Sequence, residues 1–256
     1  MIHFFTDLDN TIIYSYRREI GQDKVLVEEM DGRELSYMTR TSHQKLEMLS
    51  KKCNIIPLTT RSKKQFERIH LGDNTKIPYA LMSNGGILWN HGSFDEEWFA
   101  KSKELIADAE GELERAMEIL KGDAHLTYEI RKVDDLFVFT KSEKPEETIE
   151  RLKESLDEDK VYIDSNGVKI LVFPRILNKG DAMLRLKKWL EEKGEKDIVT
   201  VAAGDSKFDV PMIRKADYGF CPPNLEQEFN DCSHVKTLHG KVFSDELLNE
   251  VNKLEW

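Results

Sequence analysis

The sequence has few cysteines and no long apolar segment, and both features narrow the class of protein. Its 256 residues include three cysteines, Cys53, Cys221 and Cys232, which are widely spaced and form no Cys-x-x-Cys pair. Such spacing does not support a disulfide framework or a zinc site. No apolar run approaches the roughly 20 residues that span a bilayer, and Met1 leads into an apolar run without a signal peptide. We therefore expect a cytoplasmic protein with no membrane partner.

Positive charge is scarce relative to negative charge. The chain has 38 Lys and Arg residues against 48 Asp and Glu residues, which gives a formal net charge of −10. Binding to nucleic acid requires a basic face, so we expect no nucleic-acid partner. The same balance opposes long-range attraction of an anionic substrate. A phosphate site on this chain would have to be positive locally, built from a metal ion, a lysine and helix N-termini.

The chain nevertheless contains enough apolar residues for a substantial core. Hydrophobic residues make up 39% of the sequence and charged residues 34%, a composition typical of a globular protein with a heavily charged surface. Its length permits one large domain or two smaller ones.

Residues 2–11, Ile-His-Phe-Phe-Thr-Asp-Leu-Asp-Asn-Thr, predict a buried strand that ends in two carboxylates. The apolar run has the length and aromatic content of a central parallel strand, and Asp7 and Asp9 follow it directly. Open α/β sheets bind ligands at the carboxyl ends of their strands. Two acids so close together repel unless a cation lies between them or one is protonated, and Mg²⁺ would meet that requirement. An ordinary turn after a strand would give the same short pattern, so the interpretation depends on later motifs.

Two further segments have polar residues directly after an apolar run. In 54–62, Asn-Ile-Ile-Pro-Leu-Thr-Thr-Arg-Ser, the run ends at Thr59, which could cap a helix or bind phosphate. In 78–89 the strand breaks at Ser-Asn-Gly-Gly, where Asn84 and Gly85 permit positive φ and a close approach of backbone to ligand. A plain hairpin turn explains the second segment equally well.

The last two motifs lie in the C-terminal third of the chain. Asn178-Lys179-Gly180 opens a predicted helix, and a lysine in the first turn is electrostatically unfavourable at the positive end of a helix. This placement indicates either a surface lysine or a functional one. In 197–213 an apolar strand ends at Gly204-Asp205, and Asp209 follows about one helical turn later, where it could face the same point.

Two segments interrupt this pattern of strands and helices. A strand-like run on each side of Asp31-Gly32 predicts a hairpin over about 24–38, either a flap near the acid pair or a surface decoration. Residues 89–176 predict the order αββαββ, with helices at 94–121 and 146–156 and strands at 125–131, 135–140, 160–164 and 168–173. Antiparallel strands with helices on one face would form a small α+β layer inserted into the parallel-sheet domain.

These motifs, in this order, resemble those of the haloacid dehalogenase (HAD) superfamily of phosphohydrolases. Asp7-Leu-Asp9-Asn-Thr11 resembles its first motif, Thr59 the second, Lys179 the third and Gly204-Asp205-x-x-x-Asp209 the fourth. Asn-Lys-Gly and the αββαββ insertion are similar to Cof-type members with a type IIB cap, including the sucrose-phosphate-phosphatase-like group. The resemblance implies a Rossmann-like parallel-sheet core over 1–88 and 177–256 and an inserted cap over 89–176. Two departures are Thr60, where many members have glycine, and Phe208, where many have asparagine.

The resemblance also implies a Mg²⁺-dependent phosphomonoester hydrolase that acts on a small phosphorylated metabolite such as a sugar phosphate. Asp7 would be the nucleophile, and Asp9 would donate a proton to the leaving oxygen. Mg²⁺ would be held by Asp7, the backbone carbonyl of Asp9, and Asp205. A phosphomutase of the phosphomannomutase type and a non-catalytic binding protein on the same fold remain alternatives.

The phosphate group would be held by Lys179, Thr11, Thr59, Asn84 and Gly85 in this comparison. Thr11 would also brace the loop that carries Asp7, and Asp209 would orient Lys179 or a metal-bound water.

Basic residues of the inserted segment are candidates for reading the leaving group of the substrate. Arg131 and Lys132 lie at the end of a predicted strand of this segment, and Arg175 lies at the return to the core. Each could equally be a solvated residue at the end of a strand.

Overall fold

The computed structural model describes residues 1–254, and the chain divides into two compact units. The first unit combines Met1–Phe94 with the chain from Lys179 onward, and the second comprises Asp95–Asn178. The inserted segment was expected over 89–176. Residues up to Phe94 stay with the first unit because β7 (Ile87–Asn90) pairs with both β6 (Tyr79–Met82) and β8 (Ser93–Phe94). That the second unit works as a cap stays a prediction.

A parallel sheet of five strands forms the centre of the first unit, in the order β15-β14-β13-β1-β5. Its strands are β1 (Ile2–Thr6), β5 (Asn54–Pro57), β13 (Val199–Ala203), β14 (Tyr218–Cys221) and β15 (Val235–Thr237). The predicted strand β1 is buried along its whole length. At its carboxyl end, Thr6 pairs with Pro57 on one side and Ala203 on the other. The segments that follow β1, β5 and β13 therefore leave from one edge of the sheet, and the predicted α/β fold class is confirmed.

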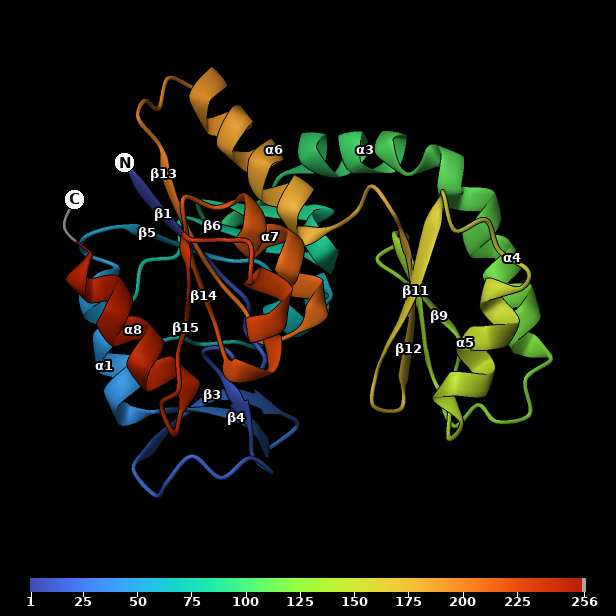
Figure 1. The fold of residues 1–256 in the computed structure, drawn as a ribbon, viewed down its shortest axis with the longest axis horizontal. Coiled ribbons are helices and arrows are strands. Elements are labelled where there is room, and N and C mark those ends of the chain that lie inside the picture. The colour runs from blue at the N-terminus through green and yellow to red at the C-terminus, as the bar shows by residue number, and fades with distance from the viewer. Residues whose placement is uncertain (255–256) are drawn as a thin grey trace. The chain divides into compact units, whose positions relative to one another are not determined.

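Helices cover both faces of this sheet (Figure 1). On one face, α1 (Arg40–Leu49) and α8 (Phe243–Lys253) contact each other and share an apolar cluster with alternate residues of the strands, such as Phe4 and Ile55. On the other, α6 (Lys179–Glu192) packs against α7 (Val210–Lys215), which contacts β13 and β14. The remaining helical segments of this unit are α2 (Lys63–Phe66), η1 (Ser83–Gly85), η3 (Lys207–Asp209) and η4 (Pro223–Phe229).

The predicted hairpin lies between the first acidic motif and α1. It consists of β3 (Lys24–Met30) and β4 (Arg33–Thr39), and β2 (Tyr14–Ser15) pairs with β4 to complete a three-stranded antiparallel sheet. Asp31 and Gly32 both adopt positive φ at the turn, which is typical of tight hairpin turns.

The second unit contains a four-stranded antiparallel sheet in the order β11-β12-β10-β9. The strands are β9 (Arg131–Val133), β10 (Phe137–Lys141), β11 (Val161–Asn166) and β12 (Lys169–Pro174). The helical segments are α3 (Glu96–Leu105), η2 (Ala107–Ala109), α4 (Glu110–Lys121) and α5 (Pro145–Lys153). An apolar cluster joins α4 and α5 to the sheet through residues such as Leu113, Leu152 and Val172.

Two elements of this unit differ from the sequence-based expectation. The single helix expected over 94–121 is broken, because the chain leaves the α-helix at Ile106 and restarts at Glu110, with Ile106 and Ala109 both buried at the break. The strand expected over 125–131 begins only at Arg131, and the segment before it contacts the sheet through the isolated bridge between Leu126 and Ser142.

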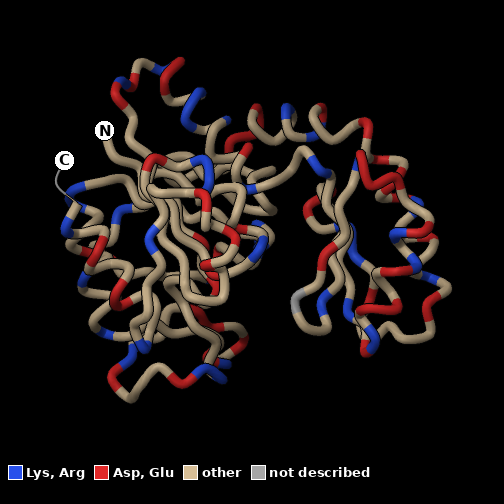
Figure 2. Tube along the Cα trace, in the orientation of Figure 1, with Lys and Arg blue, Asp and Glu red and all other residues tan. Residues whose placement is uncertain are grey.

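Among the described residues, every helix is too short or too polar to span a membrane. Lysine and arginine residues are interspersed with aspartate and glutamate residues along both units (Figure 2).

Candidate active site

A buried ion-pair triad lies at the carboxyl edge of the parallel sheet. The Lys179 Nζ atom is 2.6 Å from Asp7 Oδ1 and 2.5 Å from Asp209 Oδ1. Relative exposure is 6% for Asp7, 1% for Lys179 and 0% for Asp209. Buried charges are costly unless they are paired, and here a single ammonium group compensates the charge of two buried carboxylates. The unfavourable position of Lys179 in the first turn of α6 is offset by these two carboxylates.

Asp205 brings a further carboxylate to this triad. Oxygen atoms of Asp7, Asp205 and Asp209 lie within 4.8 Å of one another. Burial raises the pKa of the Asp7 carboxyl well above its usual range, against the opposing effect of Lys179. Burial and the neighbouring Asp209 raise the pKa of Asp205 to about 7. Burial would lower the pKa of Lys179, but Asp209 and Asp7 raise it, so the lysine stays charged. The cluster therefore contains more carboxyl groups than a single lysine could compensate if all of them were ionised.

This donor set fits Mg²⁺. Carboxylate oxygens are the ligands that hard divalent cations prefer, and a cation among them would replace protons as the compensating charge. Three carboxylates and one ammonium group, when all are ionised, carry a formal charge that a divalent cation would neutralise. Asp7 and Asp205 come from the ends of the adjacent strands β1 and β13, which explains how residues so distant in sequence meet.

Glycines permit the close packing of this cluster. A Cβ atom on Gly204 would lie 2.2 Å from the Cβ and Cγ atoms of Asp209, and one on Gly180 would lie 2.5 Å from the carbonyl oxygen of Pro211. Asp209 Oδ2 accepts hydrogen bonds from the backbone N–H groups of Asp205 and Ser206, at 3.1 and 3.0 Å. These bonds fix the turn after β13, so that the other oxygen of Asp209 faces Lys179.

Asp9 and Thr11 lie in the loop after β1 and have different partners. Thr11 Oγ1 donates to Asp7 Oδ2 at 3.5 Å. The Asp9 side chain is half exposed and forms a two-pronged ion pair with Arg61, whose Nε and Nη2 atoms each lie 2.8 Å from one of its oxygens. The Asp9 carboxylate thus contacts Arg61, whereas the predicted metal contact of this residue uses its backbone carbonyl.

Thr59 and the Asn84-Gly85 turn lie beside each other after β5 and β6. Thr59 Oγ1 accepts a hydrogen bond from the backbone N–H of Arg61 at 3.2 Å, and the Asn84 N–H donates to the Thr59 carbonyl at 3.0 Å. Asn84 and Gly85 adopt φ values of 59° and 95°, and a Cβ atom on Gly85 would lie 2.1 Å from that of Ala182 in α6. The turn requires glycine there both for its backbone conformation and for its contact with the helix that carries Lys179.

The basic candidates of the second unit have partners within that unit. Lys132 forms an ion pair with Glu110 at the start of α4, and Arg175 Nε donates to the Glu158 carbonyl at 2.7 Å. Arg131 is half exposed, pairs with Glu129 and lies over the ring of Tyr128, 4.8 Å from its centroid. Lys132 and Arg175 therefore have structural partners, and Arg131 lies against an aromatic ring.

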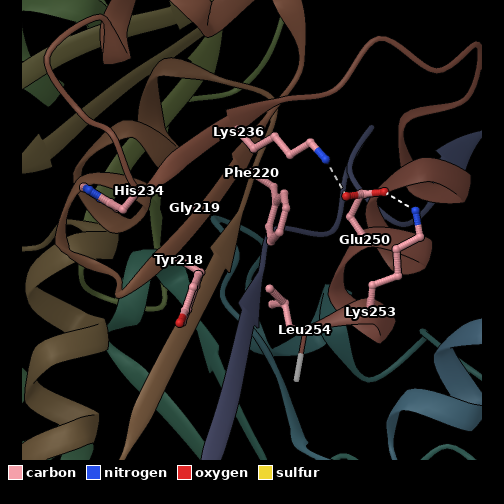
Figure 3. A pocket seen from close by; sticks show the side chains of 8 residues that line it. All are labelled: Tyr218, Gly219, Phe220, His234, Lys236, Glu250, Lys253 and Leu254. Carbon is pink, nitrogen blue, oxygen red and sulfur yellow. Dashed lines mark hydrogen bonds and ion pairs between the residues drawn. The ribbon is translucent and has the colours of Figure 1, made fainter. Parts of the chain in front are cut away.

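A shallow depression elsewhere on the first unit contains none of these acids (Figure 3). Its volume is about 240 Å³, and its lining includes Tyr218, Phe220, Lys236, Glu250 and Lys253. Glu250 pairs with both lysines, at 2.5 Å from Lys236 and 2.6 Å from Lys253. Its charged groups are thus already engaged with one another.

Two residues near the loop after β1 were not identified from the sequence. They are Arg61, which pairs with Asp9, and Glu28, which is the second carboxylate partner of Arg61. Arg61 lies in the segment that contains Thr59, so its position after a strand could have indicated it. Glu28 lies in the middle of the predicted hairpin, and no local pattern marks it.

The fold and the site together define a hydrolase of the HAD type, and comparison with known proteins agrees. The family model described as haloacid dehalogenase-like hydrolase matches residues 48–238. The chain therefore belongs to the haloacid dehalogenase-like hydrolase family, and the resemblance inferred from its motifs is confirmed.

Individual proteins match this chain either over a short segment or at low sequence identity. A phosphoserine phosphatase from Streptococcus thermophilus is 33% identical over 84 residues, which is 29% of this chain and 38% of that protein. The match therefore spans well under half of that relative. The sucrose-phosphatase of Synechocystis sp., solved with sucrose and phosphate, shares the fold with a TM-score of 0.66 at 16% identity, covering 98% of this chain and 96% of that one. A trehalose-6-phosphate phosphatase related protein gives a TM-score of 0.58 at 16% identity, covering 97% and 96% of the two chains.

Proposed function

We propose that the protein is a Mg²⁺-dependent phosphomonoester hydrolase in which Asp7 is the nucleophile. The observation that carries this proposal is the buried group of Asp7, Lys179 and Asp209, with Asp205 beside it, at the carboxyl edge of the sheet in a chain of this hydrolase family. Lys179 orients Asp7 for attack on phosphorus by binding Oδ1 at 2.6 Å, and Thr11 Oγ1 lies 3.5 Å from Oδ2.

The reaction divides into two displacements. In the first, Asp7 attacks the phosphorus atom, the bond from phosphorus to the leaving oxygen breaks, and Asp9 gives that oxygen a proton that it carries on one carboxyl oxygen while the other still accepts from Arg61. In the second, Asp9 takes a proton from water as the water oxygen attacks phosphorus, and the bond to Asp7 breaks to release inorganic phosphate. Lys179, Thr11, Thr59, Asn84 and Gly85 bind the phosphoryl oxygens, and Asp209 orients Lys179.

Asp7, Asp205 and the backbone carbonyl of Asp9 are the proposed Mg²⁺ ligands. Mg²⁺ held by these groups would neutralise the repulsion among the acids and the charge that develops on the phosphoryl group. The second unit serves as a cap that excludes water and reads the leaving group. Sugar phosphates are the proposed substrates, which is supported by the sugar-linked phosphatases among the proteins of similar fold.

A panel of phosphorylated metabolites, assayed with Mg²⁺ for release of inorganic phosphate, tests this function directly. Steady release from one sugar phosphate would support it. A phosphomutase would instead isomerise its substrate in the presence of a bisphosphate activator, and no reaction with any compound would favour a binding protein.

Replacing Asp205 by Asn should weaken Mg²⁺ dependence, because a neutral amide is a poorer ligand for a hard cation. We expect the Mg²⁺ concentration for half-maximal activity to rise about 10-fold or more. The rise in melting temperature that Mg²⁺ produces should shrink in parallel, which provides a readout independent of activity. Asp231→Asn is the matched control because Asp231 is an exposed partner of Arg214. An unchanged Mg²⁺ titration in Asp205→Asn would contradict the assignment.

Arg131 and Lys132 are adjacent residues, but we expect replacement of the first to change substrate binding and replacement of the second to change stability. Arg131→Ala should raise KM about 3- to 10-fold for the sugar phosphate that the wild-type protein prefers, because contacts remote from phosphorus contribute to substrate binding. KM for p-nitrophenyl phosphate should change little. Lys132→Ala removes one of the two lysine partners of Glu110, the other being Lys103, and should lower the melting temperature slightly without changing the substrate ranking. Equal losses on all substrates in Arg131→Ala would show that it does not read the leaving group.

A further inference from the structure

The hairpin of β3 and β4 contributes a buried glutamate near the loop after β1 that carries Asp9. Glu28 is 2% exposed, and its carboxylate accepts hydrogen bonds from three side chains. Ser36 Oγ of β4 donates to Oε2 at 2.7 Å. Arg61 Nη1 and Arg68 Nη2 each lie 2.9 Å from Oε1. The hairpin is therefore fixed to the segment after β5 by a charged network.

Arg61 joins this glutamate to Asp9. One edge of its guanidinium group holds both oxygens of Asp9, at 2.8 Å each, while Nη1 holds Glu28. A planar guanidinium group can bind one carboxylate through two parallel hydrogen bonds while another N–H binds a second carboxylate, whereas a lysine ammonium group lacks this planar fork. The backbone N–H of Arg61 donates to Thr59 Oγ1, so the main chain of the arginine is also held at the end of the strand.

The electrostatics make this a network in which each charge requires the others. Burial would raise the pKa of Glu28, but hydrogen bonds from Arg61, Ser36 and Arg68 bring it below its usual value, so Glu28 is an anion at neutral pH. Burial would lower the pKa of Arg61, whereas Asp9 and Glu28 raise it. Neutralising Glu28 would leave Arg61 and Arg68 facing each other with no anion between them, which favours displacement of Arg61.

We propose that Glu28 is a positioning residue that acts through Arg61 to hold the Asp9 carboxyl group in place for proton transfer. This inference rests on the proposed function, in which Asp9 gives a proton to the leaving oxygen and later takes one from water. Asp9 lies in a loop with its side chain half exposed, and Arg61 binds both of its carboxylate oxygens. Because Glu28 in turn fixes Arg61, the hairpin becomes part of the acid–base apparatus.

The choice of leaving group distinguishes this role from a merely structural one. An alkoxide leaving group needs a proton as its bond to phosphorus breaks, whereas p-nitrophenolate is a stable anion that leaves without one. Loss of a positioned general acid therefore slows hydrolysis of an alkyl phosphate much more than hydrolysis of p-nitrophenyl phosphate. A general loss of fold or of nucleophile geometry slows both.

The test measures kcat for glycerol 2-phosphate and p-nitrophenyl phosphate in a double-mutant cycle of Glu28→Gln and Arg61→Lys. Each single variant should lower kcat for glycerol 2-phosphate about 10- to 100-fold and kcat for p-nitrophenyl phosphate less than about threefold. Because Glu28 acts through Arg61, adding Glu28→Gln to Arg61→Lys should have almost no further effect. Asp23→Asn is the matched control, since Asp23 lies just before β3 and forms an exposed ion pair with Arg40. Melting temperatures and folded fractions are measured for every variant.

Each outcome has a distinct meaning. The positioning role would be overturned by equal losses on both esters, by no loss on either, or by a faster reaction with glycerol 2-phosphate. Additive effects in the double variant would overturn it as well. In each of these cases phosphatase activity remains. A wild-type protein that releases phosphate from neither ester nor any phosphorylated metabolite of the panel would contradict the proposed function, and this inference with it. If only a sugar phosphate of the panel reacts, it replaces glycerol 2-phosphate as the alkyl ester. If a variant is too unstable to assay, Arg68→Gln is measured instead, because it removes one of the residues that donate to Glu28. It should lower kcat for glycerol 2-phosphate more than kcat for p-nitrophenyl phosphate, but by a smaller factor.

Discussion

Asp7→Asn should remove phosphatase turnover while the protein stays folded. Asparagine nearly preserves the shape of aspartate, but its neutral amide cannot attack phosphorus, so we expect kcat to fall at least about 1,000-fold on every substrate, including p-nitrophenyl phosphate. The loss should not depend on the leaving group, because the nucleophile serves every ester equally. Steady-state release of inorganic phosphate with saturating Mg²⁺ measures the effect.

The melting temperature of Asp7→Asn should remain close to that of the wild-type protein. Lys179 keeps its 2.5 Å ion pair with Asp209, and the substitution removes one negative charge from a crowded group of acids. Asp217→Asn is a suitable control, because Asp217 accepts hydrogen bonds from Thr200 at the opposite edge of the same sheet, and its loss should affect stability alone. Turnover of Asp7→Asn within tenfold of wild type, at equal melting temperature, would exclude Asp7 as the nucleophile.

The arrangement of the core was predictable because its pattern is local. An apolar run with a polar end defines each strand, and in a parallel sheet the carboxyl ends of neighbouring strands meet at one edge. Asp7, Thr59 and Asp205 each follow such a strand, so they were expected to lie together at that edge. The unfavourable position of Lys179 in the first turn of a helix left open a surface lysine or a functional one, and in the structure it lies between the carboxylates of Asp7 and Asp209.

The network of Glu28, Arg61 and Asp9 could not be predicted in the same way. Its members lie in three separate segments, and their contacts depend on how the hairpin packs over the sheet, which no periodicity encodes. The expected strand over 125–131 failed for a related reason. Its composition suits a strand, but apart from the isolated bridge between Leu126 and Ser142 a continuous strand begins only at Arg131, because pairing depends on the partner strand β10 as well as on local preference.

Replacement of Lys179 by Met should have the largest effect on stability. Methionine retains much of the length and apolar character of the lysine stem but removes the charge that lies between two buried carboxylates. Removing one partner of a buried ion pair costs about 3–5 kcal/mol, because the remaining charges stay buried and uncompensated. For a protein of this size that corresponds to a fall of roughly 10 °C in melting temperature, measured in EDTA. Turnover should fall as well, since the same ammonium group binds the phosphoryl oxygens in the proposed reaction.

Added Mg²⁺ should separate the electrostatic cause from a packing defect. Without Lys179 the acids carry one more uncompensated charge, so Mg²⁺ should bind more strongly and raise the melting temperature of Lys179→Met by more than it raises that of the wild type. A cavity or a clash would not respond to the cation. Lys215→Met is the matched control, because Lys215 pairs with Asp181 at the surface, where ion pairs contribute little. If the melting temperature of Lys179→Met in EDTA were no lower than that of Lys215→Met, the buried triad would not stabilise the fold. A larger fall that Mg²⁺ partly reverses is the result expected of a lysine that compensates a metal-binding group of acids.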